Sequence, residues 1–183
     1  MKKILFKISV FIILFFIVDF ILGEILEPLY FKVKSGTIFN TVYGIRDTHD
    51  EILIFGASEV KHSFISKQIE DSLGLTCYNL GFDGNNIYYQ YAMLSEILDR
   101  YTPHIVVVST SITAEDESSI ISLFPFHKRY RRIRETIFEI APVEKFKTIS
   151  NAYVYNSLIL NIIQGLIYPE PETNGYRPLY NEK

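Results

Sequence analysis

The sequence predicts an α/β fold, in which helices cover a parallel sheet and a transmembrane helix precedes it. Two observations lead to this expectation: a long apolar run near the start of the chain, and alternating strand and helix patterns over residues 51–108. Such alternation implies parallel strands joined by right-handed helical crossovers. The chain has 183 residues, 48% of them hydrophobic, which excludes a disordered chain. Its single cysteine excludes a disulfide-stapled domain, and a net charge of −3 provides no general attraction to nucleic acid.

Residues 4–22 form an almost continuous apolar run that only Lys7 and Asp19 interrupt. A membrane-spanning helix needs roughly 20 apolar residues. The run therefore predicts a signal-anchor helix over residues 1–23, which contacts the membrane through residues 4–22. The positive-inside rule places the N-terminus in the cytoplasm and the main domain outside the cell membrane, because lysines gather at the start of the run: Lys2, Lys3 and Lys7.

Two other interpretations of this segment stay open. A cleaved signal peptide has the same charged start, but residues 20–24 lack the small side chains of a cleavage site. A buried core helix of a soluble domain normally has a polar face, which this segment lacks. Lys32 and Lys34, beyond the run, count against the predicted orientation. Residues 24–50 show no clean periodicity and are expected to be a connecting segment.

Strand and helix patterns alternate from residue 51 onward. Residues 51–55 are a short apolar run that ends at Gly56, and apolar side chains then recur at helical spacing from Val60 to Leu73. Gly74 is typical of a helix C-terminus, and the apolar residues after it predict a second strand over 75–80.

A turn is expected at residues 81–84, followed by a helix over residues 87–101 that Pro103 stops. The β-branched run 105–108 predicts a third strand. Together these elements predict a flavodoxin-like, three-layer parallel sheet, incomplete with about three strands, in the order 2-1-3. The third strand would have an unpaired apolar edge unless later helices cover it.

Beyond the third strand the pattern is helical. We expect helices over residues 131–140 and 143–167, and an exposed connection over residues 170–178. Residues 128–134 hold five cations, which could bind phosphate groups of lipids or of an anionic wall polymer. The other interpretation is a solvated helix face, in which Glu135 and its neighbours offset the arginines.

Ligands of open parallel sheets bind at the carboxyl ends of the strands. The candidate loops are therefore residues 56–59, 81–86 and 109–113. The Ser58 hydroxyl would lie near the free backbone N–H groups of a helix start, which suits a nucleophile whose oxyanion needs donors. Alternatively, Ser58 only caps the helix. The second loop offers amide donors, or merely a turn and a helix cap, through Asn79, Asn85 and Asn86.

The segment Ile52-Leu-Ile-Phe-Gly-Ala-Ser58, followed by Asn79-Leu-Gly81, resembles the first two blocks of the SGNH (GDSL-type) hydrolases, in particular their membrane-anchored, DltD-like branch. The resemblance covers residues 51–111 and extends loosely through residues 175–179. It implies that Ser58 is the nucleophile and that its own N–H and that of Gly81 bind the oxyanion. Three neighbouring residues are then expected to contact substrate: Glu59, Asp83 and Ser111.

Two features of that family are missing from this sequence. The asparagine of the third block has no counterpart in residues 108–113, so Asn85 or Asn86 would have to supply that oxyanion donor. The Asp-x-x-His motif is also missing, and a serine hydroxyl is a weak nucleophile without an adjacent base. His62 lies one helical turn after Ser58, where we expect a solvated helix face and not a base. Residues 51–183 are accordingly expected to be an SGNH-like domain that lacks its C-terminal part.

The sequence thus predicts a membrane-anchored extracytoplasmic protein related to ester hydrolases or acyltransferases of acylated glycans or lipids, inactive or incomplete as this chain. The alternative is a non-catalytic surface protein that binds a partner or a glycan through the same loops. A phosphate or nucleotide site at the helix starts is a third interpretation, which lacks a Gly-rich fingerprint. No cofactor is expected, the histidines and the cysteine lack metal-ligand spacing, and the predicted side of the membrane disfavours nucleic acid.

Overall fold

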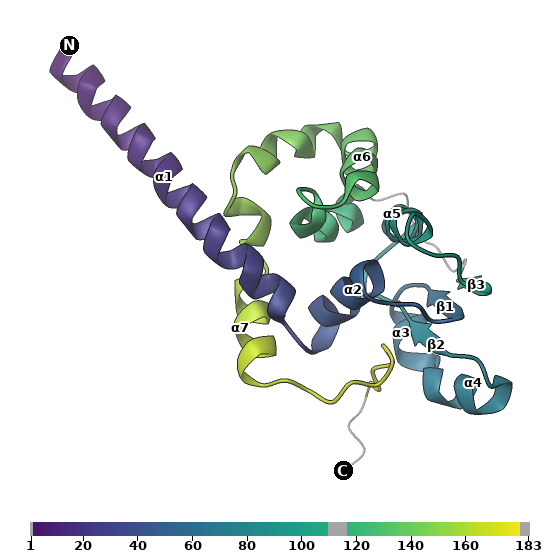
Figure 1. Ribbon diagram of the computed structural model, residues 1–183. Coiled ribbons are helices and arrows are strands. Elements are labelled where there is room, and N and C mark those ends of the chain that lie inside the picture. The colour runs from purple at the N-terminus through teal and green to yellow at the C-terminus, as the bar shows by residue number, and fades with distance from the viewer. Residues whose placement is uncertain (1, 110–116, 180–183) are drawn as a thin grey trace.

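The computed structural model describes residues 2–109 and 117–179. These residues form an α/β body from which one long helix projects (Figure 1). The projecting helix is α1, Lys2–Lys32. The predicted α/β class is confirmed, with three strands: β1, Ile52–Phe55; β2, Cys77–Asn79; and β3, Ile105–Val108.

Helix α1 is long and apolar enough to cross a membrane, and it is the one helix of the described chain that is. Its side chains from position 4 to position 22 are exposed, except for Asp19. The helix continues past residue 23, the predicted end, and its last turn enters the body. There Tyr30 and Phe31 are buried, and the Phe31 ring meets Phe126 edge-on with the ring centroids 5.4 Å apart.

The three strands form one parallel sheet in the order β2-β1-β3, as predicted. Ile52 of the central strand pairs with Cys77 on one side and with Ile105 on the other. The β1 side chains are all buried, because helices cover both faces of that strand. A run of β-branched and apolar residues is typical of a strand in that position.

Helices on the two faces give the sheet its three layers. Ile52 and Ile54 point toward α3, Ser58–Ser63, and α4, Ser66–Leu73, on one face. Leu53 and Phe55 point to the other face, into the main core, where two further helices contribute buried side chains: α2, Gly36–Arg46, and α5, Ile87–Leu98. This alternation follows from the period of two along a strand.

Residues 24–50 are largely helical, although we expected a connecting segment. They comprise the end of α1 and the whole of α2, which contributes Val42 and Ile45 to the core. Gly44 lies inside α2, where a Cβ atom would come within 2.5 Å of Leu80 Cδ2. The missing side chain lets α2 approach the sheet closely, so a packing contact accounts for this glycine.

The predicted helix over residues 60–73 is divided in two. Phe64 and Ile65 adopt extended conformations between α3 and α4, while α4 ends at Gly74 as predicted, with a left-handed φ of 68°. The side chain of Asn79 accounts for the break, because its Nδ2 donates to the carbonyls of Val60 (2.8 Å) and Phe64 (2.9 Å). The Phe64 carbonyl therefore needs no helical partner, while Val60 O also keeps its helical bond from Phe64 N (3.1 Å).

The predicted helix over residues 143–167 is also interrupted. It consists of the 3₁₀ helices η2, Pro142–Ile149, and η3, Tyr153–Tyr155, followed by α7, Ile159–Ile167. Residues 170–178 are only partly an exposed connection, because Asn79 N donates to Asn174 O (2.9 Å) and Arg177 N donates to Lys61 O (3.0 Å). This segment runs past β2 and the end of α3.

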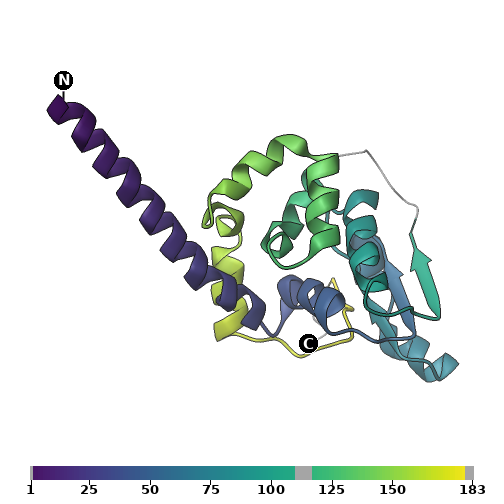
Figure 2. The ribbon, with the colours of Figure 1, turned by 45° about the horizontal axis from the view of Figure 1, so that its top comes forward.

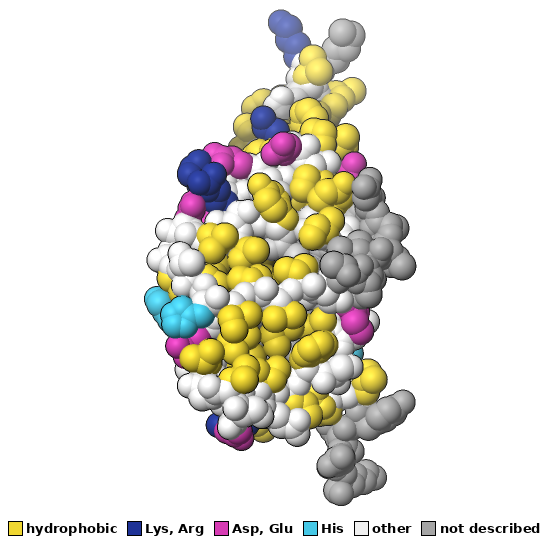
Figure 3. Space-filling model, turned by 90° about the vertical axis from the view of Figure 1, so that its right-hand side faces the viewer, with side chains coloured by type: hydrophobic (Ala, Val, Ile, Leu, Met, Phe, Trp, Pro, Cys, Tyr) yellow, Lys and Arg dark blue, Asp and Glu magenta, His cyan; other side chains and the backbone are white. Residues whose placement is uncertain are grey.

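The outer edge of strand β3 is uncovered, which is one of the two outcomes that the sequence left open. All four of its side chains are exposed, and it pairs only with β1 in the described chain. The later helices η1, Glu117–Phe126, and α6, Arg131–Ile140, pack on α5 instead. In Figure 2 β3 lies at the outer edge of the sheet, and Figure 3 shows hydrophobic side chains across much of this side of the body.

This arrangement predicts that matched substitutions in paired strands differ in cost. Ile52 is 3% exposed and its register partner Ile105 is 43% exposed. Ile52→Ala should lower the free energy of unfolding by about 3 kcal/mol and Ile105→Ala by less than about 1.5 kcal/mol, because only the first leaves a closed cavity. Urea unfolding of the full chain in detergent micelles measures both, and equal losses would contradict an open β3 edge.

Candidate functional site

Ser58 is the first residue of α3, directly after the loop that leaves β1. Its side chain is exposed and makes no hydrogen bond to the described residues. The helix start is held by Glu59 instead, whose Oε1 accepts from Ala57 N (3.2 Å) and from Ser109 Oγ (2.9 Å). Ser58 therefore does not cap α3, and its hydroxyl lies open at the carboxyl end of β1.

Gly81 does not present its N–H to the space above the sheet. That N–H donates to Asn79 Oδ1 at 2.8 Å. A Cβ atom at Gly81 would lie 2.5 Å from Lys61 N, so the glycine allows the β2 loop to contact the backbone of α3. The donor that the resemblance assigns to an oxyanion is thus engaged inside the protein.

The asparagines of the second loop also have structural partners. Asn79 is fully buried and uses its side chain on Val60 O, Phe64 O and Gly81 N. Asn86 caps α5, since its Oδ1 accepts from Tyr88 N at 3.0 Å. Asn85 Oδ1 accepts from Gln90 Nε2 (3.3 Å), while its buried Nδ2 has no partner among the described residues.

Ser111 and Asp83 are the two remaining residues that were expected to contact substrate. Ser111 lies outside the described residues. Asp83 is brought to α3, where its Oδ2 lies 2.5 Å from Lys61 Nζ and its Oδ1 lies 3.1 Å from His62 Nε2.

The expectation that His62 lies on a solvated helix face is wrong. Its Nε2 contacts Asp83, and its Nδ1 lies 2.6 Å from the carbonyl oxygen of Arg177. Only 17% of the side chain is exposed. Both ring nitrogens are therefore engaged in holding α3 to the β2 loop and to the C-terminal segment, and neither is directed at Ser58.

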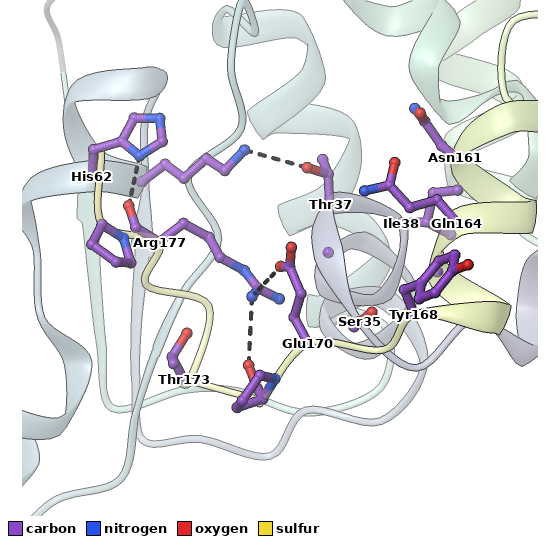
Figure 4. Close-up of a pocket in the computed structure, with 15 residues that line it drawn as sticks. Ser35, Thr37, Ile38, His62, Asn161, Gln164, Tyr168, Glu170, Thr173 and Arg177 are labelled. Carbon is purple, nitrogen blue, oxygen red and sulfur yellow. Dashed lines mark hydrogen bonds and ion pairs between the residues drawn. The ribbon is translucent and has the colours of Figure 1, made fainter. Parts of the chain in front are cut away.

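A cavity of about 610 Å³ lies on this side of α3. Four parts of the chain line it: the start of α2, the end of α3, one face of α7, and residues 170–178. Figure 4 shows Thr37, His62, Glu170 and Arg177 around it, with Asn161, Gln164 and Tyr168 on the α7 side. Sequence reasoning missed this cavity, because its walls come from positions more than 100 residues apart and no local pattern connects them.

Two cations enter this cavity from different walls. Lys61 Nζ donates to Thr37 Oγ1 (3.3 Å) as well as to Asp83, and only 8% of the lysine side chain is exposed. Arg177 Nη1 donates to Glu170 Oε2 at 2.9 Å. The Nε and Nη2 atoms of Arg177 are buried without a hydrogen-bond partner in the described chain. Leaving charged donors unpaired is costly, so this edge of the guanidinium is suited to an acceptor from outside the chain.

The start of α2 adds further donors to the cavity. Ser35, at the N-cap, makes no capping bond with its side chain, and no acidic residue lies in the first turn. Gly36 has a φ of 73°, a left-handed conformation that glycine adopts without strain. The first backbone N–H groups of a helix have no helical acceptor, and the helix dipole is positive there.

The cationic cluster at residues 128–134 is largely paired, which favours the solvated-face interpretation. Arg131 Nη1 lies 3.1 Å from Glu135 Oε1, as predicted, and Arg132 Nε lies 2.9 Å from Asp99 Oδ2. Lys128 and Arg129 contact the end of α1 through Glu27. Because most of these cations already pair with carboxylates, the cluster connects neighbouring helices and is poorly suited to bind an anion.

Neither a search for metal-binding side chains nor a comparison with known proteins assigns a function to the described residues. The described residues contain no group of three or more His, Cys, Asp or Glu side chains that could hold a metal ion. No family model, curated protein or solved structure matches the chain. The SGNH resemblance therefore stays a prediction that depends on the residues quoted for it.

The different environments of Ser58 and Asn79 predict that substitutions at these residues differ strongly in their effect on stability. Asn79→Ala should lower the free energy of unfolding by about 3 kcal/mol, because Phe64 O and Gly81 N lose their partner and Val60 O loses one of its two donors. Ser58→Ala should change it by less than about 0.5 kcal/mol, since the hydroxyl neither caps α3 nor bonds elsewhere in the described chain. Thermal unfolding of the full chain measures both, and a capping role for Ser58 would appear as a loss of about 1 kcal/mol.

Proposed function

We propose that this chain is a membrane-anchored, extracytoplasmic binding protein whose cavity takes an anionic group, a phosphate or a carboxylate, of a cell-envelope glycan or lipid. One observation carries the proposal: Arg177, whose buried Nε and Nη2 atoms have no hydrogen-bond partner in the described chain, lines a cavity that Lys61 and the start of α2 also line. The sequence left open a non-catalytic protein that binds through the loops after the strands; we propose the binding role for the cavity, which other segments line.

The anchor part of the proposal rests on α1. Residues 4–22 expose apolar side chains along a helix of sufficient length, and lysines gather at its N-terminal end. By the positive-inside rule this end stays in the cytoplasm and the body, a flavodoxin-like domain, lies outside.

The anion part of the proposal rests on geometry and charge. The Nε and Nη2 atoms form the edge of a guanidinium that binds carboxylate or phosphate with two parallel hydrogen bonds. Glu170 accepts a hydrogen bond from Nη1, whereas Nε and Nη2 have no acceptor within the described chain. The uncapped start of α2 favours negative charge, as helix N-termini do. Asn161 and Gln164 of α7 can bind further polar groups of the same ligand.

The engaged groups around Ser58 support binding over ester hydrolysis. Gly81 N–H donates to Asn79, and both ring nitrogens of His62 have partners. An SGNH-like protein in which these groups hold the fold keeps the family's strand and loop order without its acid and base chemistry. We propose this relation to ester hydrolases as one of ancestry.

Binding can be tested by calorimetric titration of the full chain in detergent micelles with glycerol 3-phosphate, with glycerol as the neutral counterpart. Only the phosphate should give saturable heat. Arg177→Gln should weaken its binding about 10-fold or more, because two charge-assisted hydrogen bonds are lost.

The matched control is Arg131→Gln, which removes a half-exposed arginine of α6 outside the cavity. This variant should bind as the parent does. If Arg177→Gln lowers the unfolding temperature, Gln164→Ala on the α7 wall provides a second test, with a smaller loss expected. Equal binding of glycerol, or unchanged binding by Arg177→Gln, would contradict the anion site.

A second candidate function is ester hydrolysis, favoured by the exposed and uncapped hydroxyl of Ser58 at the carboxyl end of β1. A fluorophosphonate probe labels serines that an adjacent base activates. We expect no labelling of the parent chain above that of Ser58→Ala. Labelling that depends on Ser58 would favour the enzyme over the binding protein.

A further inference from the structure

The middle part of α1 is fastened to the body by Asp19. This carboxylate is 7% exposed and accepts hydrogen bonds from Ser150 Oγ, from Asn151 N (2.8 Å) and from Ala152 N (3.2 Å). One helical turn further on, Gly23 lies so close to the same segment that a Cβ atom would come within 2.4 Å of Asn151 Cβ. The turn between η2 and η3 is therefore fixed against α1.

The position of Asp19 along α1 sets the depth of that turn. Asp19 lies inside the apolar run of residues 4–22, about 4.5 Å before its end at 1.5 Å per residue. A buried carboxylate among apolar residues is tolerated when it is fully hydrogen-bonded, as here. The turn over residues 150–152 is consequently level with the last part of the run and does not lie beyond it.

The elements on both sides of this turn expose apolar side chains in rows. A 3₁₀ helix has three residues per turn, so every third residue of η2 lies on one side of it. In α7, residues three and four apart share a face. We name these two rows the apolar collar; its members are 47–78% exposed and are Val143, Phe146 and Ile149 of η2, and Leu160, Ile163 and Ile167 of α7.

The other face of α7 is polar and lines the cavity through Asn161, Gln164 and Tyr168. A short helix with one polar and one strongly apolar face, beside a membrane-spanning helix, is typical of a segment that lies in the membrane interface. Tyr153 and Tyr168 are 41% and 74% exposed next to the collar, and tyrosine is enriched at that level of a bilayer.

We propose that the apolar collar lies in the outer leaflet of the same bilayer that α1 crosses, so that the body rests on the membrane. The proposal rests on the membrane-spanning α1 of the proposed function. Lipid is the occupant that the structure favours, because η2 adjoins the turn whose depth Asp19 sets, and α7 packs beside the end of α1, where a Cβ atom at Gly165 would come within 2.6 Å of Val33 Cγ1. The cavity, which shares α7 with the collar, then lies at the level of the lipid headgroups.

Depth-dependent fluorescence quenching tests the collar with the full chain in phosphatidylcholine vesicles. Burial raises the pKa of Cys77, the one cysteine of the chain, to about 11, so its thiol stays protonated and unreactive at neutral pH. A fluorophore can then be attached selectively to Phe146→Cys and Leu160→Cys in the collar, and to Ile12→Cys near the middle of the apolar run of α1. Leu73→Cys is the matched control, since Leu73 is also an exposed apolar residue, on α4 outside the collar.

A nitroxide near the lipid headgroup should remove roughly half of the emission at both collar positions, because an interfacial helix lies only 5–10 Å deep. A nitroxide near the end of the acyl chain should quench Ile12→Cys most strongly, and neither lipid should quench Leu73→Cys. Quenching at Ile12→Cys without quenching at the collar positions would contradict the proposal that the collar lies in the bilayer, while the proposed membrane span would stand. A protein partner would then be the favoured occupant of the collar. No quenching at Ile12→Cys overturns both.

Discussion

The structure depends on the buried side chain of Asn79, at the end of β2. Its amide bonds the carbonyls of Val60 and Phe64 on one side and the N–H of Gly81 on the other. Without this side chain Phe64 O and Gly81 N would lose their partner, and Val60 O would keep only its bond from Phe64 N, so Asn79 fixes the break after α3 and the way in which the β2 loop leaves the sheet. The short α3 then directs Lys61 and His62 away from Ser58 and toward Asp83 and the cavity.

This use of the loop residues separates the protein chemically from the hydrolases that its sequence resembles. An oxyanion site needs N–H groups that are free before the substrate arrives, and here the N–H of Gly81 is already satisfied. A catalytic base needs a nitrogen that faces the hydroxyl, whereas His62 joins Asp83 to the Arg177 carbonyl. In the described chain, buried donors without a hydrogen-bond partner lie on Arg177, which lines the cavity, and also on Asn85 and Arg100 outside it, while the start of α2 in the cavity wall has no side-chain cap.

Helix α7 connects the two surfaces that we propose to be functional. Its polar face lines the cavity, and its apolar face is exposed. The bonds from Asp19 to residues 150–152 and the contact of α7 with the end of α1 fix both surfaces relative to the anchor, so the depth of the anchor and the position of the cavity are mechanically linked. A ligand attached to the membrane would meet such a cavity without having to leave the bilayer surface, which reduces the entropic cost of binding.

Local patterns in the sequence determined the three parallel strands and their order, the glycine end of α4, the bounds of α6 and the apolar α1, because hydrophobic period and turn chemistry act over a few residues. Tertiary structure alone decided the helical nature of residues 24–50, the breaks at Phe64 and Ser150, and the partners of Gly81 and His62. Several of these follow from contacts between distant parts of the chain, such as Asp19 with Ser150 or His62 with Arg177, whereas Gly81 bonds the nearby Asn79. A buried hydrogen bond between residues more than 100 positions apart leaves no periodic signal, and so the cavity that such bonds assemble could be found only in the folded chain.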